Sequence, residues 1–102
     1  MLSVKQEKNG EKMTIFLEGR LDTSSTSELE QWNLKSAIRG VHHLVLDVSN
    51  LIYVSSVGLH LLFTTHEAML RRQGDMVIRG ANEGVLEVLN VTGFVEILNI
   101  EN

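Results

Sequence analysis

The chain has no cysteine, and none of its apolar stretches is long. Without cysteine it can form no disulfide, no thiolate nucleophile and no cysteine-based metal site. No apolar run approaches the ~20 residues that a membrane-spanning helix needs. The opening "MLSVKQEKNGEK" turns polar too soon to be a secretory leader. Together these absences predict a cytoplasmic protein with no membrane-inserted segment.

A clustered basic surface is also missing. Nine Lys and Arg residues are scattered among thirteen Asp and Glu residues, and the net charge is −4. Direct binding of nucleic acid is not expected, because it calls for clustered positive charge. The chain has 102 residues, of which 43% are hydrophobic and 22% charged, as is typical of a soluble globular protein. We therefore predict a single domain over residues 1–102.

The hydrophobic pattern predicts five strands. Asn9-Gly10 is suited to a hairpin turn between the first two of them, because both residues tolerate positive φ. The run "VHHLVLDVS" is continuous in β-branched residues and leucine, which is typical of a strand buried on both faces. The fourth strand is predicted over 75–80, and residues 94–100 are predicted to be a last strand or an extended tail.

Three helices are predicted between these strands. The first carries a capping box, Ser25-x-x-Glu28, and ends at Gly40. The third is opened by Asn82 and stopped near Gly93. The second runs from about residue 56 to 73, and its apolar stripe consists of Leu59, Leu62, Phe63, His66, Met69 and Leu70. The order ββαβαβαβ predicts an α/β fold, a small and mostly parallel sheet with an N-terminal hairpin and helices packed against it.

Patterns for catalysis and metal binding fail on spacing. His42 and His43 are adjacent on a predicted strand and point to opposite faces, while His60 and His66 lie about 240° apart on a predicted helix. "SSVG" departs from the G-x-S-x-G pattern of a serine nucleophile, and neither GxxxxGK nor GxGxxG occurs. We therefore expect no enzymatic activity, no cofactor and no bound metal.

Three motifs remain, namely "EGRLD", "LVLDVSNLIYVSSVGLHLL" and "GDMVIRGANEGVLEVLNVTGF". In these motifs the sequence resembles the STAS family, to which the anti-sigma-factor antagonists belong, and the resemblance covers nearly the whole chain. It rests on Gly19, Asp22, Asp47, Ser49, Leu51, Gly58 and Leu59. The fold that it implies, a small mixed sheet with helices packed against it, agrees with the order of elements predicted from periodicity.

The resemblance implies a protein-binding switch. Antagonists of this family bind an anti-sigma factor that is also a serine kinase, and they are switched off when the kinase phosphorylates a hydroxyl in the loop before the second helix. A phosphatase is then expected as a further partner. As an alternative, STAS domains also serve as subunits of ABC-type membrane transport complexes, in which such a loop contacts an ATPase and needs no phosphorylation.

The loop departs from the family's commonest spelling, Asp-Ser-Ser/Thr-Gly, because this chain reads Ser55-Ser56-Val57-Gly58. Val57 stands at the usual acceptor position, and Ser55 replaces the aspartate. Either the acceptor has moved to Ser56, with Ser55 as second choice, or the domain is not phosphorylated; helix capping alone accounts for one serine. We predict phosphorylation of Ser56 and partner contacts at Asp22, Tyr53, Ser55, Ser56, Val57, Gly58 and His60.

Three other residues are considered for a structural or a functional role. Trp32 projects away from the apolar face of the first helix, so it either anchors an interface or covers a sheet edge. Asp22 is predicted to be a turn or capping residue or a partner contact. Asp47 is interpreted mainly as a structural residue that accepts hydrogen bonds from neighbouring amides at the end of a strand.

Overall fold

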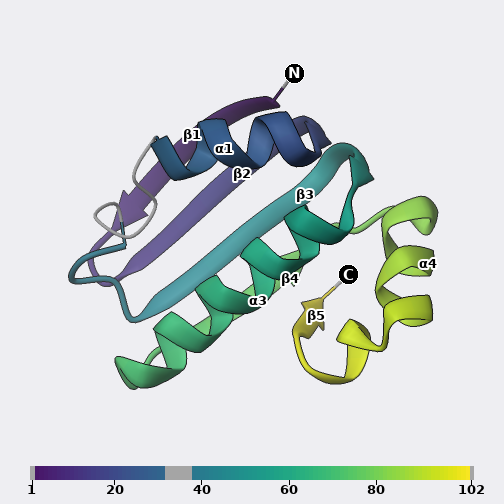
Figure 1. The fold of residues 1–102 in the computed structure, drawn as a ribbon. Coiled ribbons are helices and arrows are strands. Elements are labelled where there is room, and N and C mark those ends of the chain that lie inside the picture. The colour runs from purple at the N-terminus through teal and green to yellow at the C-terminus, as the bar shows by residue number, and fades with distance from the viewer. Residues whose placement is uncertain (1, 32–37, 102) are drawn as a thin grey trace.

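The computed structural model describes residues 2–31 and 38–101 (Figure 1). Its single sheet contains five strands in chain order: β1 (Leu2–Asn9), β2 (Lys12–Leu21), β3 (His43–Val54), β4 (Asp75–Arg79) and β5 (Asn99–Glu101). β1 and β2 are antiparallel, and the other neighbouring strands are parallel. The predicted mixed sheet with an N-terminal hairpin is therefore confirmed.

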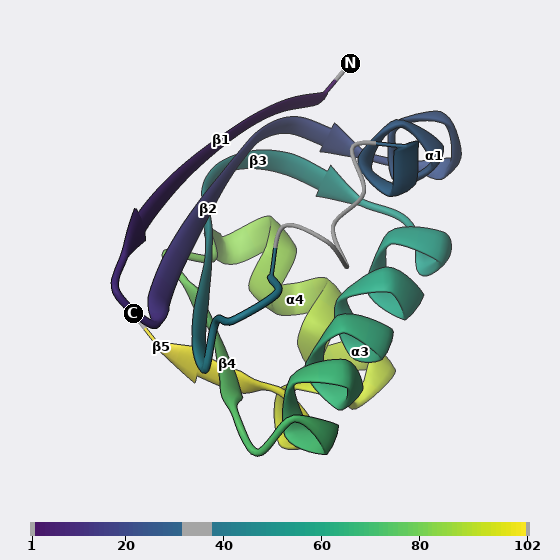
Figure 2. The same cartoon turned by 90° about the vertical axis from the view of Figure 1, so that its left-hand side faces the viewer.

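The helices cover one side of this sheet. α3 (Ser56–Arg71) and α4 (Glu83–Thr92) lie on the concave face, and α1 (Thr23–Gln31) packs where β2 ends (Figure 2). No described helix covers the convex face. Between α4 and β5, Phe94–Glu96 form the short 3-10 helix η1, so only the end of the predicted segment 94–100 becomes a strand.

The strand β3 differs from the prediction that both its faces are buried. Leu44, Leu46 and Val48 are buried against the helices, whereas Val45 and Asp47 on the convex face are only half-buried. The continuous apolar run does not imply two covered faces, because only one layer of helices packs on the sheet.

The hairpin turn lies one residue later than predicted. Asn9 pairs with Lys12, so the two-residue turn consists of Gly10 and Glu11. Only Gly10 takes a positive φ there, at 64°. A glycine tolerates this conformation without steric cost.

The caps of α4 follow the prediction, but the start of α1 and the end of α3 do not: α3 ends at Arg71, and Gln73, with a φ of 62°, takes the left-handed conformation in place of Gly74, the predicted stop. Asn82 caps α4 by accepting a hydrogen bond from the Val85 amide, and Gly93 ends it in the left-handed conformation, as predicted. α1 begins at Thr23, which makes Ser25 an internal residue of its first turn and not the N-cap. The predicted extension to Gly40 passes through residues 32–37, which include Trp32 and lie outside the described residues.

The apolar stripe of α3 is rotated relative to the prediction. Leu59, Leu62, His66 and Met69 are buried as expected, but Leu70 is 54% exposed. Phe63 is half-buried beside the Phe94 ring, with 5.9 Å between the ring centroids. Thr65, which the apolar pattern did not include, is buried instead. Its hydroxyl donates a hydrogen bond to the Leu61 carbonyl at 2.8 Å, so the buried hydroxyl has a partner within the helix.

Candidate functional site

Two irregularities in the pairing of β2 with β3 shape the carboxyl end of the sheet. Phe16 pairs with Asp47 but Glu18 with Asn50, and Gly19 pairs with Leu51 but Arg20 with Tyr53. Each shift inserts one extra residue into β3, which is a β-bulge. The buried positions of β3 accordingly change from every second residue to every third, at Val48, Leu51 and Val54.

The second bulge turns two adjacent side chains toward solvent. Ile52 is 70% exposed and Tyr53 is 41% exposed. In a regular strand neighbouring side chains point to opposite faces, so one of the two would be directed toward the helices. Ile52 was not among the predicted contact residues, because the neighbouring Leu51, Tyr53 and Val54 are also apolar or aromatic and the sequence alone does not show which of them turn outward.

Arg20, near the end of β2, stacks on Tyr53, and Asp22, just after the strand, pairs with Arg20. The Arg20 guanidinium lies over the Tyr53 ring, 4.5 Å from its centroid, and Arg20 Nε is 3.7 Å from Asp22 Oδ2. Asp22 in turn caps α1: its carboxylate accepts a hydrogen bond from the Ser25 amide, and its amide donates to the Ser25 hydroxyl. This is the reciprocal geometry of a capping box. Asp22 is thus a capping residue, one of its two predicted roles.

The charge of Asp22 is favoured by the same contacts. The hydrogen bond from the Ser25 amide is the main reason that the pKa of Asp22 is lowered. Its partial desolvation acts in the opposite direction, and the nearby Arg20 charge adds to the lowering. Asp22 is therefore an anion at neutral pH, and it partly neutralises Arg20.

The two loop serines have different surroundings. Ser55 is half-buried and is the N-cap of α3: its amide donates to the Leu21 carbonyl, and its hydroxyl accepts from the Gly58 amide at 3.1 Å. Ser56 is the first residue of the helix and is exposed. Within the described part of the chain, its hydroxyl makes no hydrogen bond. The structure therefore assigns the capping role to Ser55 and leaves the Ser56 hydroxyl accessible.

Gly58 does not lie on the surface, in contrast to its prediction as a contact residue. It is buried where the first turn of α3 meets the end of β2, and a Cβ atom at this position would be 2.7 Å from the Leu21 carbonyl oxygen and 2.8 Å from Leu21 Cγ. Gly58 therefore sets how closely α3 approaches the sheet and cannot offer a side-chain contact.

We expect Gly58→Ala to destabilise the fold by about 1–3 kcal/mol, the usual cost of overpacking. Gly84 is a matched control in the first turn of α4, since its added Cβ would meet only Asn82 Oδ1 at 3.4 Å. Gly84→Ala should stabilise the protein by about 0.5–1 kcal/mol through helix propensity. Urea denaturation of both variants measures the difference. A gain in stability for Gly58→Ala would contradict the close contact with Leu21.

Val57 and His60, the remaining predicted contact residues, lie in the first turns of α3. Val57 is 42% exposed, and His60, which follows one turn later on α3, is also exposed. Figure 2 shows β2 and β3 ending side by side next to the first turns of α1 and α3. We call the exposed set the β3–α3 surface; it consists of Arg20, Ile52, Tyr53, Ser56, Val57 and His60.

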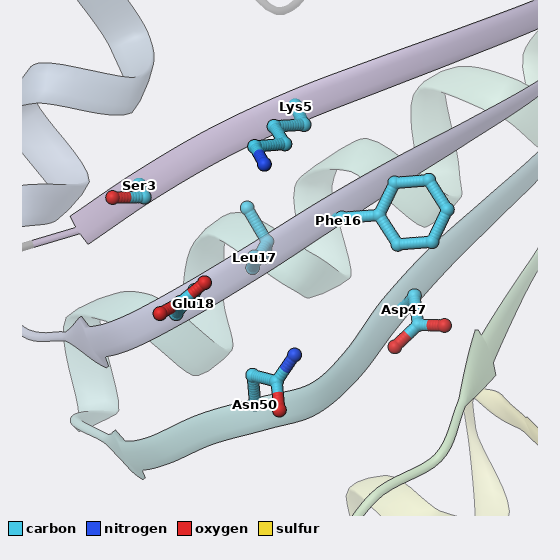
Figure 3. Close-up of a pocket in the computed structure, with 7 residues that line it drawn as sticks. All are labelled: Ser3, Lys5, Phe16, Leu17, Glu18, Asp47 and Asn50. Atoms are coloured by element: carbon cyan, nitrogen blue, oxygen red, sulfur yellow. The ribbon is translucent and has the colours of Figure 1, made fainter.

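A separate cluster of polar side chains lies on the convex face of the sheet. Ser3, Lys5, Phe16, Glu18, Asp47 and Asn50 line a shallow hollow of about 180 Å³ (Figure 3). Asp47 accepts hydrogen bonds from the amide and hydroxyl of Ser49 at 3.0 and 2.6 Å, and from Arg79 Nε and a terminal guanidinium nitrogen at 3.2 and 2.9 Å. Both Asp47 oxygens are therefore occupied in fixing the first bulge of β3 to β4.

Asp47 is expected to make stability depend on pH in acid. Burial raises its pKa, but the Ser49 hydrogen bonds and the Arg79 guanidinium outweigh burial and leave the pKa below its usual value of 3.8. The ionised carboxylate therefore stabilises the folded state above that value, and this contribution is lost as the pH falls through the lowered pKa. Asp47→Asn should be less stable at neutral pH and should lose less stability between pH 5 and pH 2 than the wild type.

Thermal unfolding across that pH range tests the assignment. Ser49→Ala, which removes one of the hydrogen bonds to Asp47, should give an intermediate pH dependence. If Asp47→Asn keeps the acid-side slope of the wild type, the dependence arises from other carboxylates.

The histidines do not assemble into a metal site among residues 2–31 and 38–101, where no group of three or more His, Asp or Glu side chains could hold an ion. His43 Nδ1 is 3.1 Å from Asp75 Oδ1, and His42 Nδ1 is 3.5 Å from Glu11 Oε1. His66 is buried and its Nδ1 has no hydrogen-bond partner in the described chain, whereas His60 is exposed. The same described residues contain no helix long and apolar enough to cross a membrane.

The family model of the STAS domain matches residues 3–102. The chain belongs to the STAS family. The resemblance seen in the sequence motifs is thereby confirmed.

Relatives and solved structures agree with this assignment. BtrV of Bordetella bronchiseptica is 28% identical over 86 residues, with 84% of this chain and 74% of BtrV covered. The anti-sigma F factor antagonist of Paenibacillus polymyxa is 27% identical over 101 residues, with 97% and 86% covered. The structure of Bacillus SpoIIAA in its phosphorylated form matches with a TM-score of 0.74 at 16% identity, covering 98% of this chain and 92% of that one. At that identity the structural likeness shows a common fold.

Proposed function

We propose that this STAS protein is an anti-sigma-factor antagonist that binds its anti-sigma factor through the β3–α3 surface. The observation that carries the proposal is the accessible Ser56 hydroxyl, which stands among exposed apolar side chains at the start of α3. The names of its relatives support the same role, since the matched protein of Paenibacillus polymyxa is an anti-sigma F factor antagonist. Binding of this kind requires no catalytic group on the antagonist.

The proposal includes regulation by phosphorylation of Ser56. A hydroxyl at the first position of a helix can be modified without breaking the fold, because helix N-termini favour anions. The Gly58 amide already donates a hydrogen bond to the Ser55 hydroxyl, and the Leu59 amide donates one to the Ser55 carbonyl. The amides of Ser56 and Val57 belong to the first turn, whose N–H groups have no acceptor within the helix, and they can face a phosphate. SpoIIAA, with the same fold, has a phosphorylated form.

Ser55 is the less suitable acceptor. Its hydroxyl is half-buried and already accepts a hydrogen bond from the Gly58 amide. A kinase would have to break the cap of α3 to reach it, at a cost of about 1 kcal/mol. We therefore assign the phosphate to Ser56, with the anti-sigma factor as the serine kinase and a phosphatase as the enzyme that restores binding.

A second candidate function is favoured by one observation, the presence of Val57 where the family's usual acceptor stands. In that case the protein is an unphosphorylated subunit of an ABC-type transport complex, and the same surface contacts an ATPase. The two functions differ in the partner and in the fate of Ser56, so one set of measurements separates them.

The test is a binding and labelling experiment on the intact protein. We expect a purified anti-sigma factor of the source organism to bind the unmodified chain in calorimetry, and its kinase activity with ATP to add one phosphate, located at Ser56 by peptide mass spectrometry. Ser56→Ala should bind but accept no phosphate. Binding to an ABC ATPase, with no affinity for any anti-sigma factor of that organism, would replace the first proposal by the second.

A further inference from the structure

Ile52 has an exposure that the fold does not require. It is the extra residue of the second bulge, and 70% of it is accessible to solvent. A polar β-branched residue such as threonine would serve the strand equally well at such a position. The apolar character of Ile52 therefore has no explanation in the packing of this domain.

Ile52 is also not isolated. Tyr53 and Val57, both partly exposed, lie within five residues of it on either side of the β3–α3 turn. The first turn of α3 contains no acidic residue, and the cation nearest to Tyr53, Arg20, is partly neutralised by Asp22. This part of the surface is thus apolar with little net charge, and its natural complement is an apolar patch on a protein.

The Tyr53 side chain is held in place before any partner binds. Its ring is held under the Arg20 guanidinium, and Arg20 is held by Asp22, which is fixed by the cap of α1. An aromatic side chain that is ordered in advance loses less conformational entropy on binding. Tyrosine and arginine are enriched at the residues that dominate binding energy, and such residues cluster at the centre of an interface.

We propose that Ile52 is a specificity-determining contact for the anti-sigma factor, inserted with Tyr53 and Val57 into an apolar depression of that partner. This inference rests on the proposed function, because it takes the occupant of the β3–α3 surface from there. Arg20 acts as a positioning residue in this contact, through its stacking on Tyr53.

The experiment compares two substitutions by threonine at exposed β-branched residues. Ile52→Thr keeps β-branching and removes apolar area from the β3–α3 surface, and Val91→Thr makes a comparable change at a valine that is 80% exposed on α4. We expect Ile52→Thr to weaken binding of the purified anti-sigma factor about tenfold or more, because a hydroxyl replaces the two-carbon ethyl arm of isoleucine at an interface centre. Val91→Thr should change the affinity less than about twofold. Neither variant should shift the urea midpoint appreciably.

The positioning role of Arg20 is tested by a double-mutant cycle. Arg20→Met should weaken binding when Tyr53 is present and have little further effect in a Tyr53→Ala background, because both changes remove the same contact. Additive losses would assign Arg20 a contact of its own with the partner.

The outcomes separate this inference from the proposed function. If the wild type binds, Ser56→Asp weakens binding, and Ile52→Thr binds like the wild type, then the inference about Ile52 is wrong while the proposed function stands. If the wild type binds no anti-sigma factor, both are overturned. Equal losses for Ile52→Thr and Val91→Thr would also overturn the inference, since the effect would not be specific to the β3–α3 surface.

Discussion

Phosphorylation of Ser56 is expected to lower the affinity for the anti-sigma factor by about a hundredfold or more, which corresponds to about 2.7 kcal/mol. The phosphate adds about −1.5 to −2 charge at pH 7. Around Ser56 the surface is apolar, with Ile52, Tyr53 and Val57 exposed beside it. A partner that covers these side chains would have to remove water from the phosphate, and the loss of solvation of an unpaired charge is costly.

This explanation makes a distinct prediction about salt. If desolvation dominates, the loss of affinity on phosphorylation should persist when the salt concentration is raised from 0.1 to about 1 M. If the phosphate instead repels acidic residues of the partner, high salt should restore much of the affinity. Calorimetry of the stoichiometrically phosphorylated protein at the two salt concentrations distinguishes these causes.

Two variants control the measurement. Ser56→Ala should keep the wild-type affinity within about threefold, because it removes only an exposed hydroxyl. Ser56→Asp should give a smaller loss than the phosphate, since a carboxylate carries only about −1 charge. A fully phosphorylated protein that binds as tightly as the unmodified one would refute the switch.

The order of elements could be predicted from the sequence because each signal is local. Asn82 and Gly93 bound α4 as their capping preferences require, and the strands alternate with helices in the predicted order. The capping box of α1 was assigned to the wrong pair, Ser25 and Glu28, because Asp22 and Ser25 have the same spacing. The position at which the strand ends and the helix begins decides between the two pairs.

The candidate site was predicted less completely, for reasons of tertiary structure. The sequence places hydroxyls at the start of α3, but only the contact between Gly58 and Leu21 shows which residues turn inward. Likewise, the bulges in β3 depend on its register with β2, which a single-strand pattern does not contain. Ile52 and Arg20 became visible as surface residues only through that pairing. The family resemblance drew attention to Ser55 and Ser56, and the structure shows that Ser55 caps α3 while Ser56 is exposed.

The second large effect concerns the core face of α3, where two leucines of one helix are expected to behave differently. Leu62→Ala should destabilise the fold by about 2–5 kcal/mol, as buried leucine truncations do, because Leu62 is only 3% exposed. Leu70→Ala should cost less than about 0.5 kcal/mol, since Leu70 is 54% exposed and alanine is the better helix former. Urea denaturation measures both changes in one residue type on one helix.

This pair decides between the sequence pattern and the packed structure. The 3.6-residue period places Leu62 and Leu70 in one stripe, whereas in the structure the buried face passes through Leu59, Leu62 and Met69 and turns Leu70 outward. The rotation is possible because Thr65 satisfies its own hydroxyl within the helix and can enter the core. Comparable losses for the two variants would mean that α3 packs as the simple pattern predicts, and α3 would then present a different set of side chains beside Ser56.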